Sequence, residues 1–274
     1  MAPKRSIIVT GGASGIGLGI TRHFITEPNT HITVLDVNPT TGAQTLDQLR
    51  AEFPSAGVSF EQCDVSSWES QAEVFERIHS QQGRIDVVFA NAGITEKGSL
   101  LPEKGGNSNG PTKPNLATVN VNFVGVIYSV QLAIHYMAKN ELSGSSKGLI
   151  VCTASNAGLY PFPMAPIYSA TKHGVIGLVR SLARPLEAES IRINALAPAV
   201  IATNIAPSTD LFKSMALTPM STATKAVAQL VEDETLTGRV AELHGEHVTL
   251  AEAPAYVDED TGKNIETFWS LGYA

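Results

Sequence analysis

The chain has 274 residues, of which 43% are hydrophobic and 16% are charged, and its formal net charge is −7. This composition is typical of a globular α/β protein and excludes a disordered chain. The acidic balance disfavours nucleic acid or an anionic membrane as the main partner. Cys63 and Cys152 lie in apolar runs, so we expect reduced, buried thiols. We expect a cytoplasmic protein, because no apolar run approaches a membrane span and the apolar run near the start is too short for a signal peptide.

The first predicted unit is a strand, a glycine-rich turn and a helix. Residues 6–10 (SIIVT) form a β-branched run, followed by TGGASGIG and an amphipathic stretch. Gly11 permits the tight turn, Gly15 lets a pyrophosphate approach the backbone, and Gly17 lets the helix lie close to the strand. Glycine turns of this kind also occur without a ligand, and the pattern by itself leaves both possibilities open.

Two further predicted strands lead to carboxylates. Residues 31–36 (HITVLD) end at Asp36, and residues 57–62 (GVSFEQ), which follow a predicted helix, lead to Asp64. A carboxylate at Asp36 can accept both ribose hydroxyls of an adenosine and repels a 2′-phosphate, which favours NAD over NADP. A solvated aspartate at a strand end is the simpler alternative. Asp64 is placed to meet an adenine amino group.

The fourth predicted strand, 85–90 (IDVVFA), runs into Asn91-Ala92-Gly93. We expect Asn91 to stabilise the central sheet through side-chain hydrogen bonds, and we give this structural role at least as much weight as a catalytic one. Gly93 would let a cofactor ribose pass.

A polar loop and a long apolar helix follow. Residues 95–114 are rich in glycine, proline, serine and asparagine, which predicts a mobile loop inside the domain. Residues 115–140 are apolar on all sides, which predicts a helix buried on more than one face. Asn122 interrupts it and either holds a water that links Lys172 to solvent or marks a local kink.

The stretch 147–180 predicts a buried strand, an elbow at Ser155, an apolar loop and a second helix. Tyr168 and Lys172 are four residues apart, so they lie one turn apart on one helical face. An ammonium that close should lower the pKa of the tyrosine. Together with the Ser155 hydroxyl, such a tyrosine can exchange a proton with an alcohol oxygen.

The last third of the chain continues the alternation. A strand over 190–196 is followed by an irregular segment, 199–220, that we interpret as a substrate lid. A helix and a last strand, 238–243, precede the tail 251–274, which either caps the cleft or covers an edge. We therefore predict one α/β domain over 1–274, a doubly wound Rossmann-type parallel sheet of about seven strands with helices on both faces. The remaining predicted helices cover 40–52, 67–82 and 221–235, and the histidine spacing predicts no metal site.

The motifs taken together resemble those of the compact short-chain dehydrogenase/reductase family. TGGASGIG, Asp36, the NAG of 91–93, Ser155 and YSATK (168–172) occur in the family's order, up to about residue 245. The resemblance implies that Tyr168 is the acid/base and that Lys172 lowers the pKa of Tyr168 and binds the nicotinamide ribose. It also implies that Ser155 orients the substrate oxygen and that Asn122 holds a relay water. It implies cofactor contacts at Gly11, Ser14, Gly15, Ile16, Gly17, Asp36, Asp64, Val65, Asn91, Ala92, Gly93, Tyr168, Lys172, Pro198, Ile201 and Thr203.

Within the family, the chain is similar to NAD-dependent 15-hydroxyprostaglandin dehydrogenases and to fungal dehydrogenases of secondary metabolism. It departs from them where Ala165 replaces a glutamine, and from the family where Ala199 replaces a glycine after Pro198. The loop 159–167 (LYPFPMAPI) indicates an apolar, bulky substrate. Pro185 should kink the tyrosine-bearing helix or end it early. The expected substrate contacts are Ser155, Tyr160, Phe162, Ala165 and Tyr168.

Three functional hypotheses remain open at this stage. The first is an NAD-dependent dehydrogenase that oxidises a secondary alcohol on an apolar small molecule, and the second is an NADH-dependent ketoreductase with the same residues. The third is an NAD(H)-binding sensor or scaffold without catalysis, which the fold alone permits. The apolar surface of the two long helices further predicts a homodimer or homotetramer built on a four-helix contact.

Overall fold

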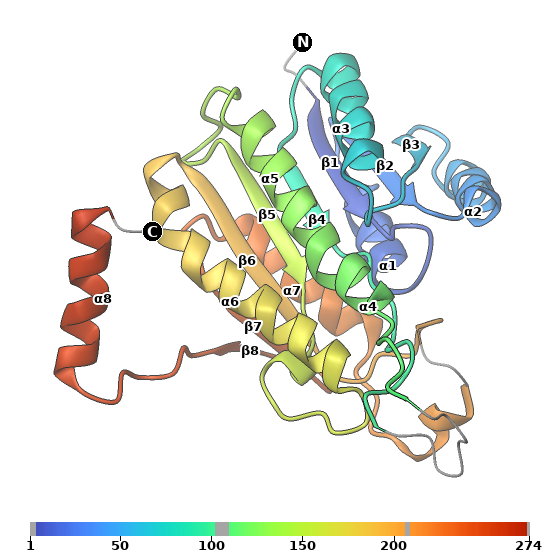
Figure 1. Cartoon of the computed structure of the whole chain (residues 1–274). Helices are drawn as coiled ribbons and strands as arrows, with labels where there is room; N and C mark the ends of the chain where they lie inside the picture. Colours follow the sequence, from blue (N-terminus) through green and yellow to red (C-terminus); the bar gives the residue numbers. More distant parts are fainter. Residues whose placement is uncertain (1–3, 102–109, 206–208, 273–274) are drawn as a thin grey trace.

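The computed structural model describes residues 4–101, 110–205 and 209–272. Its centre is one eight-stranded sheet with the order β3-β2-β1-β4-β5-β6-β7-β8, in which β8 alone is antiparallel to its neighbour (Figure 1). The sheet thus has one strand more than the predicted seven or so. The strands are β1 Arg5–Thr10, β2 Thr30–Asp36, β3 Gly57–Gln62, β4 Val87–Ala90, β5 Gly148–Thr153, β6 Ile191–Pro198, β7 Val240–His244 and β8 His247–Ala251.

Helices cover both faces of the sheet, which confirms the doubly wound architecture. α3, α5 and α6 cover one face, and α1, α2 and α7 cover the other (Figure 1). The helices are α1 Gly15–Phe24, α2 Pro39–Glu52, α3 Trp68–Gln82, α4 Ala117–Val119, α5 Gly125–Met137, α6 Pro166–Ala188, α7 Met220–Glu232 and α8 Glu259–Leu271, with 3₁₀ turns at Asn156–Gly158 and Thr209–Ser214.

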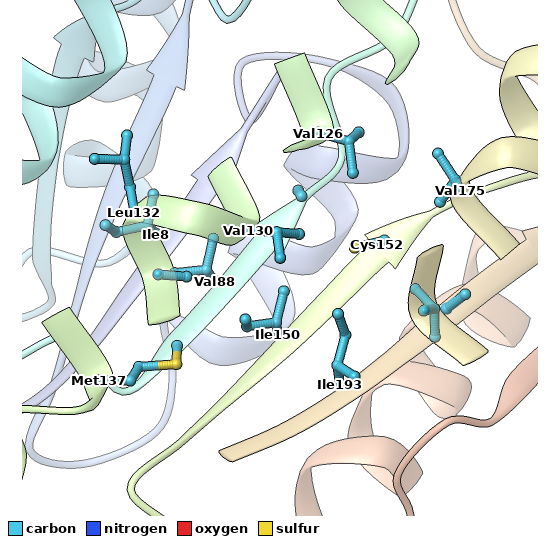
Figure 2. Close-up of a cluster of buried hydrophobic side chains, with 14 of the residues drawn as sticks. Ile8, Val88, Val126, Val130, Leu132, Met137, Ile150, Cys152, Val175 and Ile193 are labelled. Carbon is cyan, nitrogen blue, oxygen red and sulfur yellow. The ribbon is translucent and has the colours of Figure 1, made fainter. Parts of the chain in front are cut away.

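The two faces of the sheet bury alternate residues of each strand. Ile8 packs with α5 and α6 on one face, whereas its neighbour Ile7 packs with α1 and α7 on the other. This follows from the two-residue period of a strand, and a parallel sheet covered on both faces therefore reads as a continuous apolar run. Figure 2 shows part of the first of these clusters, which includes Val126 and Val130 of α5 and Ile150 of β5.

The apolar helix predicted over 115–140 is divided in the structure. α4 passes into a π-helical turn, Asn120–Val124, and then into α5. Asn122 lies in this turn and is fully buried, and such turns occur preferentially at functional sites.

One expectation about membranes is corrected. By length and hydropathy, Ala117–Met137 would suffice to cross a membrane, contrary to the prediction that no apolar run approaches a span. Its apolar residues include Val126, Val130 and Met137, which are buried in the core (Figure 2). The span is 44% buried and Ile127 is 38% exposed, so the helix packs on the core with one face and keeps another face uncovered. The core helix of a globular protein can have the same composition as a membrane helix.

The helix α6 passes through Pro185 and ends three residues later, at Ala188, so the proline does not end it early. A proline removes the hydrogen bond to the carbonyl four residues earlier, here that of Ser181. Ser181 is exposed, so solvent can satisfy that carbonyl.

Of the tail, the described residues 251–272 do not line the cleft. A tight turn at Gly245, whose φ is +52°, follows β7 and leads into the short strand β8, which covers the edge of β7. α8 then stands beside the end of α6 (Figure 1), where Arg184 bonds Glu266 at 2.8 Å and lies 4.7 Å from the centroid of Trp269. Every residue of α8 is at least partly exposed. Tyr273, residues 102–109 of the predicted loop and residues 206–208 of the predicted lid lie outside the described residues.

Candidate active site

A cleft of about 640 Å³ opens at the carboxyl ends of the strands, around the switch in strand order between β1 and β4. Ligands of open α/β sheets bind at this place because the loops after neighbouring strands diverge there. All the predicted cofactor residues except Gly17 line the cleft. Residues that sequence reasoning did not assign to the site also line it, among them Cys63, Ser66, Ile94, Thr95, Lys97, Val121, Asn204 and Ile205.

The glycine turn after β1 has the geometry that the sequence predicts. Gly11 and Gly15 have φ values of +62° and +52°, which L side chains rarely adopt. A Cβ at Gly17 would lie 2.2 Å from the Gly11 carbonyl oxygen, so Gly17 is the position where α1 packs tightly on the turn. Ser14, Gly15 and Ile16 line the cleft at the start of α1, where an anion is favoured.

Two carboxylates lie at the carboxyl ends of β2 and β3, at the same edge of the sheet. Asp36 lines the cleft, and its Oδ1 accepts the Asn38 backbone N–H at 3.1 Å. Asp64 also lines the cleft, and its Oδ1 accepts both the N–H and the O–H of Ser66, at 2.9 and 2.7 Å. Among the described residues that line the cleft, the cations are Lys97 and Lys172, neither of which follows β2.

Asn91 joins three neighbouring strands, as predicted. Its Nδ2 donates to the Thr10 carbonyl of β1 at 3.1 Å, and its Oδ1 accepts from Thr153 Oγ1 of β5 at 3.0 Å. The Thr10 hydroxyl in turn accepts the backbone N–H groups of Asn91 and Ala92. These bonds confirm the structural role of Asn91 and hold the carboxyl end of β4 at the cleft.

Asn122 clamps the segment that follows Gly93. Its Nδ2 donates to the Ile94 carbonyl and its Oδ1 accepts the Ile94 N–H, both at 2.8 Å. A Cβ at Gly93 would lie 3.4 Å from Asn122 Oδ1 and 3.6 Å from Lys172 Nζ, so a side chain there would fill the space between them. The relay water predicted for Asn122 stays a prediction.

Ser155, Tyr168 and Lys172 meet on one wall of the cleft. Ser155 begins the turn after β5, where its Oγ accepts the Ala157 N–H at 3.2 Å, and it also hydrogen-bonds the Tyr168 phenol. Lys172 lies one turn after Tyr168 in α6, as the spacing predicts, with its Nζ 5.5 Å from the tyrosine ring centroid. The buried ammonium donates to the Thr153 carbonyl at 2.7 Å. The group therefore joins a phenol and a hydroxyl that can exchange protons with an oxygen in the cleft.

The electrostatics of this wall differ from the sequence-based expectation. Burial raises the pKa of Tyr168 above its ordinary value, although the hydrogen bond with Ser155 opposes the rise. Burial also lowers the pKa of Lys172 from 10.5 to about 8. The net direction is opposite to the expected one because desolvation of the phenolate dominates, and the separate contribution of Lys172 to the tyrosine pKa stays a prediction.

The predicted substrate residues divide into two groups. Ser155 and Tyr168 line the cleft, and Phe162 lies close by, with its ring centroid 6.5 Å from that of Tyr168. Tyr160 instead donates to Glu242 on β7 at 3.0 Å, and Ala165 is buried at the start of α6. Of the described residues, those that line the cleft include none between Ser155 and Tyr168.

Sequence reasoning missed the segment directly after Gly93. The Glu96 carboxylate accepts the backbone N–H of Tyr168 at 2.8 Å, and Thr118 Oγ1 bonds both the Thr95 carbonyl and the Lys97 N–H. The first residues of the predicted mobile loop are therefore tied to two helices. Their position at the carboxyl end of β4 was the available signal, since ligands collect there.

Comparison with known proteins gives a consistent result. The family model for short chain dehydrogenases matches residues 5–213. The chain is 31% identical over 244 residues to the short-chain dehydrogenase/reductase prx7 of Penicillium rubens, covering 86% of this chain and 84% of that protein. It is 29% identical over 255 residues to the 15-hydroxyprostaglandin dehydrogenase [NAD(+)] of Rattus norvegicus, covering 86% and 89%. Among solved structures, gox2181 has a TM-score of 0.72 at 25% identity, covering 87% of this chain and 93% of that one.

Proposed function

The chain belongs to the short-chain dehydrogenase family, whose members are nicotinamide-dependent oxidoreductases of small molecules, and we propose that it is an NAD-dependent dehydrogenase of a secondary alcohol. The observation that carries the proposal is the meeting of Ser155, Tyr168 and Lys172 on the wall of a dinucleotide-sized cleft. A binding protein without catalysis has no need of this set beside the cofactor site.

The residues of the cleft fit a dinucleotide along its length. The start of α1 would hold the pyrophosphate, Asp36 the adenosine ribose, and Asp64 with Val65 the adenine. The nicotinamide end would be lined by Pro198 at the end of β6 and by Ile201 and Thr203 after it, together with Asn91, Ala92, Gly93, Tyr168 and Lys172. When bound, the cofactor supplies the hydride acceptor or donor.

NAD is the cofactor that this cleft favours over NADP. A 2′-phosphate beside Asp36 would meet a carboxylate, and the two cations of the described lining stand after β4 and on α6. Like charges in a partly desolvated cleft repel each other strongly. One relative, the rat enzyme, is named as NAD(+)-dependent.

In the proposed reaction Tyr168 exchanges a proton with the substrate oxygen. In oxidation its phenolate takes the hydroxyl proton, and in reduction its phenol returns one to the forming alcohol. The Ser155 hydroxyl and the Lys172 ammonium stabilise the negative charge that develops on this oxygen. We favour oxidation because cellular NAD is mostly oxidised; the ketoreductase direction uses the same groups.

The substrate that we propose is apolar and bulky. Val121, Ile201 and Ile205 give the cleft apolar surface, and outside its lining the loop between Ser155 and α6 exposes Phe162 and Met164, the latter 87% exposed. Apolar side chains gathered around a few polar groups are typical of sites for small apolar ligands. We also propose a cytoplasmic setting and a homodimer or homotetramer formed through α5 and α6.

The proposal is tested by a screen of secondary alcohols with NAD against NADP, followed by the absorbance of the reduced cofactor. Tyr168→Phe should keep NAD affinity and lose turnover by about 10²–10⁴-fold, the usual contribution of a general acid/base. Tyr256→Phe, in the exposed tail, is the matched control and should leave turnover unchanged. Turnover that survives in Tyr168→Phe would contradict the mechanism.

A further inference from the structure

The tyrosine-bearing helix α6 begins without a local cap. Its first residue is Pro166, which has no N–H, and the preceding Ala165 has a methyl side chain that accepts no hydrogen bond. The first backbone N–H bonded within this helix is that of Ser169, which donates to the Ala165 carbonyl. The N–H of Tyr168 therefore needs an acceptor from elsewhere in the chain.

Glu96 supplies this acceptor from 72 residues away in the sequence. Its Oε2 accepts the Tyr168 N–H at 2.8 Å, a short bond of the charge-assisted kind. The carboxylate also lies at the start of a 23-residue helix, where the aligned backbone dipoles favour a negative charge.

The segment that carries Glu96 is itself held in place from the other side. Asn122 bonds both the N–H and the carbonyl of Ile94, and Thr118 bonds the Thr95 carbonyl and the Lys97 N–H. Asn122 and Thr118 are both fully buried. A continuous path of hydrogen bonds thus runs from the helical segment before α5, through residues 94–97, to the backbone of Tyr168.

We propose that Glu96 is a positioning residue that holds the first turn of α6, and with it Tyr168, in register with Ser155 and the cofactor cleft. The inference rests on the proposed function, since it concerns the geometry of the same proton transfer. Glu96 touches the Tyr168 backbone and not the reacting atoms. Its loss should therefore reduce turnover without changing cofactor affinity.

The test compares Glu96→Ala, Glu96→Gln and the wild-type protein. Glutamine keeps a carbonyl oxygen that can accept the N–H, whereas alanine removes the acceptor. We expect Glu96→Ala to lower kcat about 10- to 100-fold with the dissociation constant of NAD within about threefold of wild type, since small misplacement of a reacting group has effects of this size. Glu96→Gln should restore most of kcat.

A matched control is Asp258→Ala, which removes a carboxylate cap with the same 2.8 Å bond from α8, far from the cleft. It should leave kcat unchanged. Hydrogen exchange of the Tyr168 amide gives a readout that needs no turnover, and this amide should exchange at least about fivefold faster in Glu96→Ala, as expected for a lost cap.

Each outcome bears on one proposal. A kcat of Glu96→Ala within twofold of wild type, equal impairment of the alanine and glutamine variants, or unchanged exchange of the Tyr168 amide would overturn the role of Glu96. Turnover that persists in Tyr168→Phe would instead overturn the proposed function. If the wild-type protein turned over no alcohol or ketone, amide exchange would still decide whether Glu96 holds Tyr168.

Discussion

Replacing Gly17 by alanine tests whether the packing of α1 on the glycine turn builds the cofactor site. A Cβ at Gly17 would lie 2.2 Å from the Gly11 carbonyl oxygen and 2.7 Å from Asn91 Nδ2. Neither atom can yield easily. The first belongs to a turn with positive φ, and the second donates to the Thr10 carbonyl of β1.

The size of the effect follows from these distances. Because real Cβ atoms keep at least 3.0 Å from such neighbours, α1 must move by roughly 0.8 Å or the turn must open. Overpacking of this kind destabilises by about 1–3 kcal/mol. Alanine gains back about 0.5–1 kcal/mol of helix preference over glycine. We therefore expect a net loss of about 0.5–2 kcal/mol. We also expect at least about tenfold weaker NAD binding, equivalent to about 1.4 kcal/mol.

Denaturant unfolding and an NAD titration measure the two effects. The matched control is Gly177→Ala in α6, where a new Cβ meets no atom of the described chain within 4 Å. This change should raise the free energy of unfolding by about 0.5–1 kcal/mol, the opposite sign to Gly17→Ala. A Gly17→Ala protein as stable as wild type, with unchanged NAD affinity, would refute the reasoning.

Three further predictions concern Lys172, Asp36 and the tail. The pKa of Lys172 falls from 10.5 to about 8 on folding, so the unfolded chain binds more protons than the folded chain between these pH values. The free energy of unfolding of the wild type relative to Lys172→Met, measured with denaturant, should therefore rise from about pH 8 to pH 10.5. A difference that does not change with pH would contradict the burial argument. Asp36→Ala should lower kcat/KM for NAD about tenfold while kcat/KM for NADP stays the same or rises, because the carboxylate that would repel a 2′-phosphate is lost. An unchanged ratio of kcat/KM for NAD to kcat/KM for NADP would show that Asp36 does not determine the cofactor preference. Truncation after Ala251 should leave the unfolding temperature within about 2 °C, because every residue of α8 is at least partly exposed and its ion pair with Arg184 is exposed too. A larger fall would show that α8 is covered in solution.

The order of strands and helices could be predicted from the sequence because a covered parallel sheet leaves a local signal. Each buried strand reads as a short apolar run, and each connecting helix has its own period. The prediction failed where this signal is weak. β8 is a short, half-exposed edge strand, and the π-helical turn at Asn120–Val124 has the same apolar composition as the α-helix around it.

The part of the candidate site that could be predicted consists of residues at short, regular spacing in the sequence. Gly11, Gly15 and Gly17 are close in sequence, as are Tyr168 and Lys172, so local geometry is enough to place them. Burial is a property of the whole fold, and for this reason the raised pKa of Tyr168 could not be inferred from the neighbouring lysine.

The sequence by itself determined the fold class and the family and pointed to the candidate site residues, because these depend on periodicity and on motifs with short spacing. Only the tertiary structure brought Glu96 to the backbone of Tyr168 and Asn122 to Ile94, contacts between residues 72 and 28 positions apart. It also decided that the described part of the tail, residues 251–272, does not line the cleft. Such contacts depend on how the helices pack on the sheet, and this packing cannot be predicted from the local sequence pattern.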